Sequence, residues 1–124
     1  MTEKIIDGIK YRLNEETKTA EVIKKKDGYE GDIIIPATVV FDEYTYRVTG
    51  IGKEAFHECD SLTSVVIPNG VTSIEEGAFA DCNSWRVIRY GGTVKQCERR
   101  FRYWDQCFHS EIVYCTDGDT QIHW

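Results

Sequence analysis

The sequence has no long apolar run, because its hydrophobic residues nowhere approach the ~20 consecutive positions that a membrane-spanning helix needs. It also lacks the basic start and extended apolar stretch of a secretory signal peptide, since residues 1–10 read MTEKIIDGIK. We therefore expect no membrane insertion. The chain either stays inside the cell or follows a leader that has been removed.

Basic residues are also relatively few: the chain has 15 lysine and arginine residues and 21 aspartate and glutamate residues, which gives a net charge of −6. An acidic chain is poorly suited to a phosphate backbone, so we expect no nucleic-acid partner. Arg99, Arg100 and Arg102 do interleave with aromatic residues, as in nucleic-acid-binding proteins. Amphipathic packing with the arginines outward explains this cluster without a nucleic acid.

Cysteines are few, and their number, five, argues against a fully paired disulfide framework. None has the tight C-x-x-C spacing of common zinc sites. Cys97, Cys107, His109 and Cys115 could still supply four zinc ligands by number and type, so a metal-dependent enzyme is an alternative hypothesis. Buried thiols and a surface histidine explain the same residues, and we expect no metal or cofactor.

What the sequence does have is a repeat. Residues 48–70 read VTGIGKEAFHECDSLTSVVIPNG, and residues 71–93 read VTSIEEGAFADCNSWRVIRYGGT. The step from one copy to the next is 23 residues, and it carries Phe56 to Phe79. Repeats of about 20–30 residues build solenoids, in which each unit buries its apolar face against its neighbours. We therefore expect these two phenylalanines to stack in a shared core.

Each repeat contains a strand that ends in a turn. Leu62, Val65 and Ile67 follow an L-x-x-L-x-L spacing, and Pro68-Asn69-Gly70 then turns the chain. The common leucine-rich pattern places Asn or Cys three residues after the last strand leucine, whereas Gly70 stands there in this chain. The sequence therefore indicates a different class of leucine-rich repeat.

Cys59 recurs one repeat later as Cys82, which suggests a small buried hydrophobe in each coil. Stacked coils would not forbid a disulfide between them by distance, but their parallel side chains favour free thiols. His57 and Cys59 also invite a catalytic dyad. Because Ala80 replaces the histidine in the next repeat, we interpret that position as solvent-facing. With no set of nucleophile, base and oxyanion donors, we expect no enzyme.

Residues 48–82 resemble the BspA-like leucine-rich repeat family of bacterial surface proteins, whose units read close to LTSIxIPxxVTSIGxxAFxxC. Residues 7–39 and 88–119 are similar to the β-rich first segment and the last segment of these proteins. The resemblance implies a mostly β fold with short helical turns. It would be a short right-handed leucine-rich-repeat solenoid with an N-terminal β-hairpin cap and an atypical C-terminal cap.

We expect one domain of 124 residues. Residues 1–47 would form the β-rich cap and first strand, 48–70 and 71–93 the repeats, and 94–124 a degenerate repeat with the C-terminal cap.

Two hairpins are expected within the first segment. Polar and apolar residues alternate on both sides of NEETKT, which is typical of a hairpin. The motif DIIIPATV at 32–39 matches SVVIPNGV at 64–71 with an offset of 32, and FDEYTYR between them would form a second hairpin.

By resemblance, the chain is a non-catalytic module for protein–protein interaction, with adhesion to a protein or matrix ligand as the expected role. Self-association into a larger repeat array is an alternative. The family implies a cell-surface or secreted location if a leader was removed, and otherwise a cytoplasmic one. The ligand and the oligomeric state stay open.

The strand pattern predicts which residues would form a binding face. If Val65 and Ile67 point inward, their neighbours point outward, because strand side chains alternate. The same phase is carried to the earlier strand, the second repeat and the closing strand. An apolar row with one cation is typical of contact surfaces, although β-branched residues also suit exposed strands. The predicted face is Asp32, Ile34, Ser64, Val66, Val87, Arg89 and Val113.

Overall fold

The computed structural model describes residues 1–75, 77–79, 87–100 and 112–121. Within these ranges the chain is mostly β with one short helix, as predicted. The elements are β1 (Thr2–Ile6), β2 (Ile9–Asn14), β3 (Thr19–Val22), β4 (Gly31–Ile34), β5 (Thr38–Phe41), β6 (Tyr44–Ile51), β7 (Leu62–Ile67), β8 (Ser73–Ile74), β9 (Val87–Tyr90), α1 (Val94–Arg100), β10 (Ile112–Cys115) and β11 (Gly118–Gln121).

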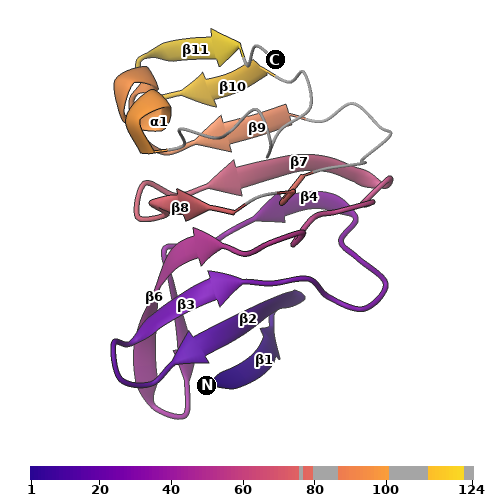
Figure 1. Ribbon diagram of the computed structural model, residues 1–124, viewed down its shortest axis with the longest axis vertical. Helices are drawn as coiled ribbons and strands as arrows, with labels where there is room; N and C mark the ends of the chain where they lie inside the picture. The colour runs from indigo at the N-terminus through magenta and orange to yellow at the C-terminus, as the bar shows by residue number, and fades with distance from the viewer. Residues whose placement is uncertain (76, 80–86, 101–111, 122–124) are drawn as a thin grey trace.

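The strands form two sheets (Figure 1). Sheet A has the order β1-β2-β3-β6-β5, and β8 also pairs with β6. Sheet B has the order β11-β10-β9-β7-β4. Figure 1 shows sheet B as a stack from β11 at the top to β4 in the middle, with β3, β2 and β1 below.

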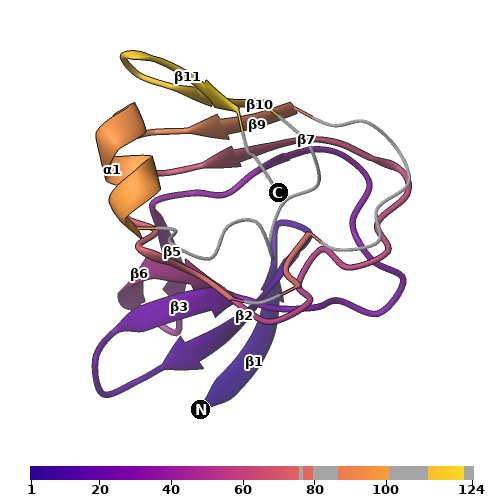
Figure 2. The ribbon, with the colours of Figure 1, turned by 45° about the horizontal axis from the view of Figure 1, so that its top comes forward.

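The chain passes back and forth between the sheets, so that β3 leads to β4, β6 to β7 and β8 to β9. In sheet A, β3 and β8 each pair with β6 in parallel, and in sheet B the strands β4, β7, β9 and β10 pair in parallel. Parallel neighbours need long crossover connections, which the opposite sheet provides. The result is a stack of coils, whose two strand layers lie on opposite sides in Figure 2.

The register of sheet B follows the repeat. Val65 lies opposite Ile88 on one side, at the offset of one repeat, and opposite Ile33 on the other. Both pairings confirm the alignment read from the sequence. The coil β3–β4 therefore stacks directly on the first repeat.

Two predicted hairpins are confirmed. β2 and β3 pair in antiparallel fashion around NEETKT, where the Asn14 side-chain oxygen accepts hydrogen bonds from the amides of Glu16 (3.0 Å) and Thr17 (3.2 Å). β5 and β6 pair around Asp42 and Glu43, both of which have positive φ (52° and 70°). Two successive residues with positive φ characterise the hairpin turn whose twist matches that of its strands.

The core lies between the two sheets and is continuous from coil to coil. The rings of Phe56 and Phe79 stack with centroids 5.0 Å apart and planes 4° from parallel, as predicted from the repeat. Tyr29 extends this stack to the earlier coil, with its ring centroid 4.9 Å from that of Phe56. All three side chains are buried, so they tie successive coils to one another.

α1 begins where the repeat pattern weakens, and a capping box explains its start. Thr93 Oγ1 accepts a hydrogen bond from the Gln96 amide (3.1 Å), and Gln96 Oε1 accepts one from the Thr93 amide (2.9 Å). Asp117 satisfies another free amide at this end, that of Val94, at 2.9 Å. Among the described residues, no helix is long and apolar enough to cross a membrane.

Candidate interaction surface

Six of the seven residues predicted for the binding face lie side by side on sheet B. Ser64 stands between Asp32 on β4 and Val87 on β9, and Val66 stands between Ile34 and Arg89 in the same way. Asp32, Ile34 and Arg89 are exposed, and the other three are half-buried. We call Ile34, Val66 and Arg89 the outer row.

The prediction for Val113 is wrong, because this side chain is buried in the core with 1% of its surface exposed. The sequence alignment placed Ile112 and Tyr114 at the positions of the inward residues Ile88 and Tyr90. In the structure Val113 lies opposite Ile88, one residue away from that alignment. A shift of one residue moves every side chain of a strand to the other face.

Tyr114 therefore takes the place that was predicted for Val113 and lies opposite Arg89 at the end of the outer row. The guanidinium carbon of Arg89 is 5.2 Å from the centroid of the Tyr114 ring. A cation over an aromatic face at this distance is worth about 0.5–1 kcal/mol at an exposed site. The contact holds a cation and an aromatic ring together on the outward face.

Thr63 is an outward residue that the sequence analysis missed. Gly31 pairs with Leu62 but Asp32 pairs with Ser64, so β7 carries one extra residue at this point. Thr63 and Ser64 both donate a hydrogen bond to Asp32 Oδ1, at 2.7 Å each. These hydrogen bonds lower the pKa of Asp32, and the bond from Ser64 has the largest effect. The sequence did carry a signal for this extra residue, because the L-x-x-L spacing leaves two residues between inward positions.

An apolar patch that the sequence analysis also missed surrounds Ile34. Ile34 is 69% exposed and Val40 on β5 is 64% exposed. Ile34 and Val40 line a pocket of about 400 Å³ together with Ile6, Ile9, Pro36 and Val39. The chain therefore presents apolar surface at the β4 end of the outer row, where an exposed hydrophobic patch is typical of contact sites.

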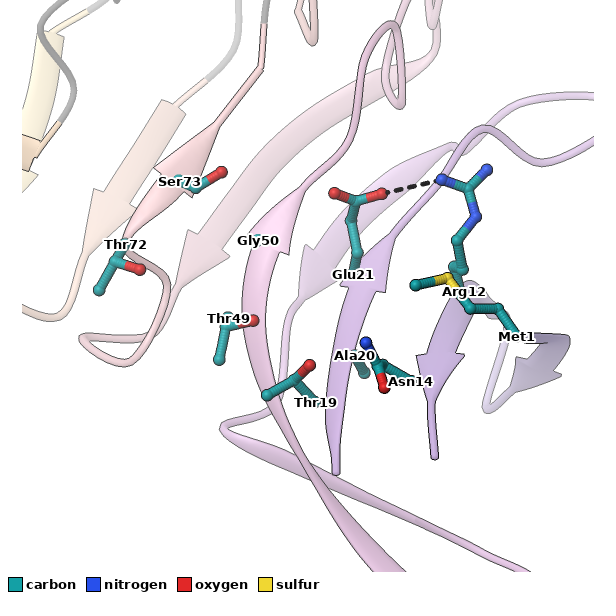
Figure 3. Close-up of a pocket in the computed structure, with 10 residues that line it drawn as sticks. All are labelled: Met1, Arg12, Asn14, Thr19, Ala20, Glu21, Thr49, Gly50, Thr72 and Ser73. Atoms are coloured by element: carbon teal, nitrogen blue, oxygen red, sulfur yellow. Dashed lines mark hydrogen bonds and ion pairs between the residues drawn. The ribbon is translucent and has the colours of Figure 1, made fainter. Parts of the chain in front are cut away.

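The outward face of sheet A has a different character (Figure 3). A pocket of about 310 Å³ lies over β2, β3 and β6, with Thr49, Gly50, Thr72 and Ser73 along one side. Arg12 and Glu21 form an ion pair across it at 3.4 Å. Burial raises the pKa of Glu21, the Glu75 carboxylate raises it further, and Arg12 offsets part of the shift. Polar side chains make up most of its lining, and Arg12 and Glu21 face one another in it.

The cysteine–histidine pair of the first repeat does not form a dyad. The buried Cys59 sulfur accepts a hydrogen bond from the Tyr29 amide at 3.4 Å and donates one to the His57 carbonyl at 3.7 Å. The sequence analysis predicted a solvent-facing histidine. In the structure the His57 side chain is mostly buried, with 17% of its surface exposed, so this prediction is wrong. The carboxylates of Glu54 (3.9 Å) and Glu58 (4.0 Å) lie beside its ring. Both glutamates have positive φ.

Of the four possible zinc ligands, the structure describes Cys97 and Cys115. Burial raises the pKa of Cys97 to about 12, and the Cys115 thiol, which is hydrogen-bonded to it, adds to the shift. Neither of them, nor Cys59, forms a disulfide. In the described part of the chain, no group of three His, Cys, Asp or Glu residues is placed to hold a metal ion. Cys82, Arg102, Cys107 and His109 lie outside the described residues.

Comparison with protein families identifies the fold. The BspA type leucine rich repeat region (6 copies) matches residues 43–114, which is more than half of the chain. The chain therefore belongs to the BspA-type leucine-rich repeat family. A search of curated proteins finds no match.

Three solved structures are similar. A leucine rich cell surface protein of Faecalibacterium prausnitzii has 32% identity and a TM-score of 0.61, over 73% of this chain and 24% of that one. A leucine-rich repeat protein of Bacteroides ovatus has 31% identity and a TM-score of 0.59, over 69% and 23%. Another, of Bacteroides capillosus, has 26% identity and a TM-score of 0.59, over 73% and 72%. The match thus spans about a quarter of the first two proteins.

Proposed function

We propose that this chain is a non-catalytic module that binds a protein ligand through the outward face of sheet B. The observation that carries the proposal is the outer row, in which Ile34, Val66 and Arg89 lie in register across three strands. Tyr114 continues the row on β10. Repeat proteins of this kind commonly present an open sheet surface for binding.

The composition of this surface supports the proposal. Aromatic residues and arginine are enriched in protein interfaces, whereas lysine, glutamate, aspartate, serine and alanine are depleted. The outer row and Tyr114 contain an arginine and an aromatic ring and none of the depleted types, although Asp32 and Ser64 lie beside them. Asp32 lies beside the row with its carboxylate already hydrogen-bonded to Thr63 and Ser64. A ligand would thus cover apolar surface without stripping water from an unpaired carboxylate.

The proposal extends to location and partner. One similar chain is described as a leucine rich cell surface protein. We therefore place this chain at a bacterial surface, where it takes part in adhesion to a protein or matrix ligand.

It extends also to the finer architecture expected from the sequence. In this proposal the chain is one domain that forms a right-handed solenoid, with its first cap within residues 1–47 and its last within 94–124. The antiparallel hairpins β1–β2 and β10–β11, each at one end of a sheet, support this division.

The test is a double substitution, Val66→Glu with Arg89→Glu, measured by biolayer interferometry against a panel of purified matrix and bacterial-surface proteins. A matched control, Thr72→Glu with Arg47→Glu, makes the same change in net charge at exposed residues of the sheet A coils. We expect both variants to fold by circular dichroism and only the first to lose binding. Equal binding by both, or loss in the control alone, would contradict the proposal.

A further inference from the structure

We infer that β4 is a docking strand: an extended segment of the protein ligand adds to its free edge and places apolar side chains on the patch around Ile34. This inference rests on the proposed protein-binding function and names the form of the partner. It assigns the contact to backbone groups of β4 rather than to side chains of the outer row alone.

β4 is the end strand of sheet B, with β7 as its neighbour. The amide of Ile35, just beyond β4, donates to the Val66 carbonyl at 3.0 Å, so this amide points toward β7. Along a strand, the N–H and C=O groups of one residue point to the same side, and those of the next residue point to the other side. The amides and carbonyls of Asp32 and Ile34 therefore point away from β7, toward the free edge. A row of such groups is a template for another strand.

Space for such a strand lies beside this edge. A cleft of about 690 Å³ is lined by Glu30 and Ile33 from the β4 side, by Ile5, Gly8 and Lys10 from the β1–β2 hairpin, and by Lys25, Lys26 and Asp27 from the loop between β3 and β4. The apolar pocket of about 400 Å³ lies against Ile34 and also reaches this hairpin. The two hollows therefore flank the gap between β4 and β1–β2. An added strand sends alternate side chains to opposite faces, so it would fill both.

β4 itself carries little of the usual protection, and the nearby lysines, Lys10, Lys25 and Lys26, line the cleft beside it from other segments. Exposed edge strands are commonly guarded by lysine or other outward charges, and β1, the end strand of sheet A, carries exposed Glu3 and Lys4. β4 contains one charge, Asp32, and the hydrogen bonds from Thr63 and Ser64 turn its carboxylate toward β7. Ile34 stays exposed beside this edge. A guest strand with β-branched apolar residues at alternate positions fits this surface.

The test uses a phage-displayed library of random peptides, selected on the full chain, as the probe. We expect selected peptides to carry β-branched residues at alternate positions. When bound, they should slow amide exchange of Asp32 and Ile34 at least about tenfold by NMR, since these amides gain hydrogen bonds. The amide of Ile35, already bonded to Val66, should change little. Peptides that leave the Asp32 and Ile34 amides unprotected would overturn the inference.

Two substitutions at one position separate backbone pairing from side-chain contact. Ile34→Pro removes the outward amide, whereas Ile34→Thr keeps the amide and the β-branched shape. We expect Ile34→Pro to weaken peptide binding about tenfold and Ile34→Thr to retain most of it. Equal losses would overturn strand addition. The exchange measurement on the unsubstituted chain decides the question if Ile34→Pro does not fold.

The outcomes distinguish this inference from the proposed function. Binding that is lost in Val66→Glu with Arg89→Glu but kept in Ile34→Pro would overturn strand addition and leave the proposed function standing. Binding that survives both changes would overturn both. If sedimentation shows that β4 instead pairs with a second copy, and Ile34→Pro abolishes that dimer, the inference about the partner is also overturned.

Discussion

The two sheets are made by the same coils, yet their outward faces differ. On sheet A, Glu3 lies 3.5 Å from Lys10 and 3.7 Å from Arg12, and Arg12 lies 3.4 Å from Glu21. On sheet B the outer row has two apolar residues and one arginine, which lies over the Tyr114 ring. The charges around β1–β3 of sheet A thus face partners within the chain, whereas the outer row of sheet B presents Ile34 and Val66. Sheet A also exposes apolar side chains, at Ile5, Val40 and Tyr44, away from its paired charges.

The difference shows how one repeat can serve two purposes. Exposed ion pairs contribute about 0–1 kcal/mol each to stability, so the network on sheet A mainly satisfies its own charges. Burial of apolar surface is worth about 25 cal/mol per Å², which favours contact through the apolar residues of the outer row. The predictions below test this division, from the largest expected effect to the smallest.

The largest effect on stability is expected in the core between the two sheets. Phe79→Ala removes one member of the Phe56–Phe79 stack, and we expect a loss of about 3–5 kcal/mol in the free energy of unfolding. Val40→Ala, at an exposed β5 position, should change it by less than about 0.5 kcal/mol. Urea denaturation measures both. Comparable losses would show that the stacked phenylalanines do not tie the coils together.

A smaller effect is expected from the close packing of sheet A around Gly52. A Cβ at this position would lie 3.0 Å from Glu21 Oε1 and 3.2 Å from the Val22 carbonyl oxygen. Gly52→Ala should therefore destabilise the chain by about 1–3 kcal/mol. Gly70→Ala is the matched control, because its Cβ would meet ordinary contacts no closer than 3.6 Å. Thermal unfolding should separate the two, and equal melting temperatures would argue against this packing.

The smallest effect is a contrast in pH dependence between the sheets. The pKa of Glu21 on sheet A is raised by burial, whereas the pKa of Asp32 on sheet B is lowered by its hydrogen bonds. The contribution of Glu21 to stability is fully present below its unfolded pKa and is lost as pH rises through the folded value. That of Asp32 is present above its unfolded pKa and is lost as pH falls through the folded value. Carboxyl NMR titration should find the two pKa values on opposite sides of the ordinary range. Shifts in the same direction would contradict the contrast.

The repeat made much of sheet B predictable. The offset of one period puts Ser64 opposite Val87 and Val66 opposite Arg89, because stacked coils preserve the phase of their strands. The earlier strand could be aligned as well, since DIIIPATV keeps the pattern despite the inserted hairpin.

Beyond the second repeat, the sequence no longer indicates which side chains of a strand point inward. Val113 was assigned to the wrong face because no repeated residue fixes β10 relative to β9. The start of α1 had a local signal in the T-x-x-Q pattern of Thr93 and Gln96. The apolar pocket at Ile34 and Val40 had none, since it joins these residues to Ile6 and Ile9, which are distant in sequence.

The most direct test of the central claim is methyl NMR of the chain titrated with a protein ligand from the binding panel. The claim is that the outward face of sheet B, and not that of sheet A, takes the ligand. We predict that the methyl resonances of Ile34, Val66 and Val87 shift on binding, while those of Thr49 and Thr72 beside the sheet A pocket stay in place. Shifts of the two threonine methyls with unchanged Ile34, Val66 and Val87 signals would contradict the account.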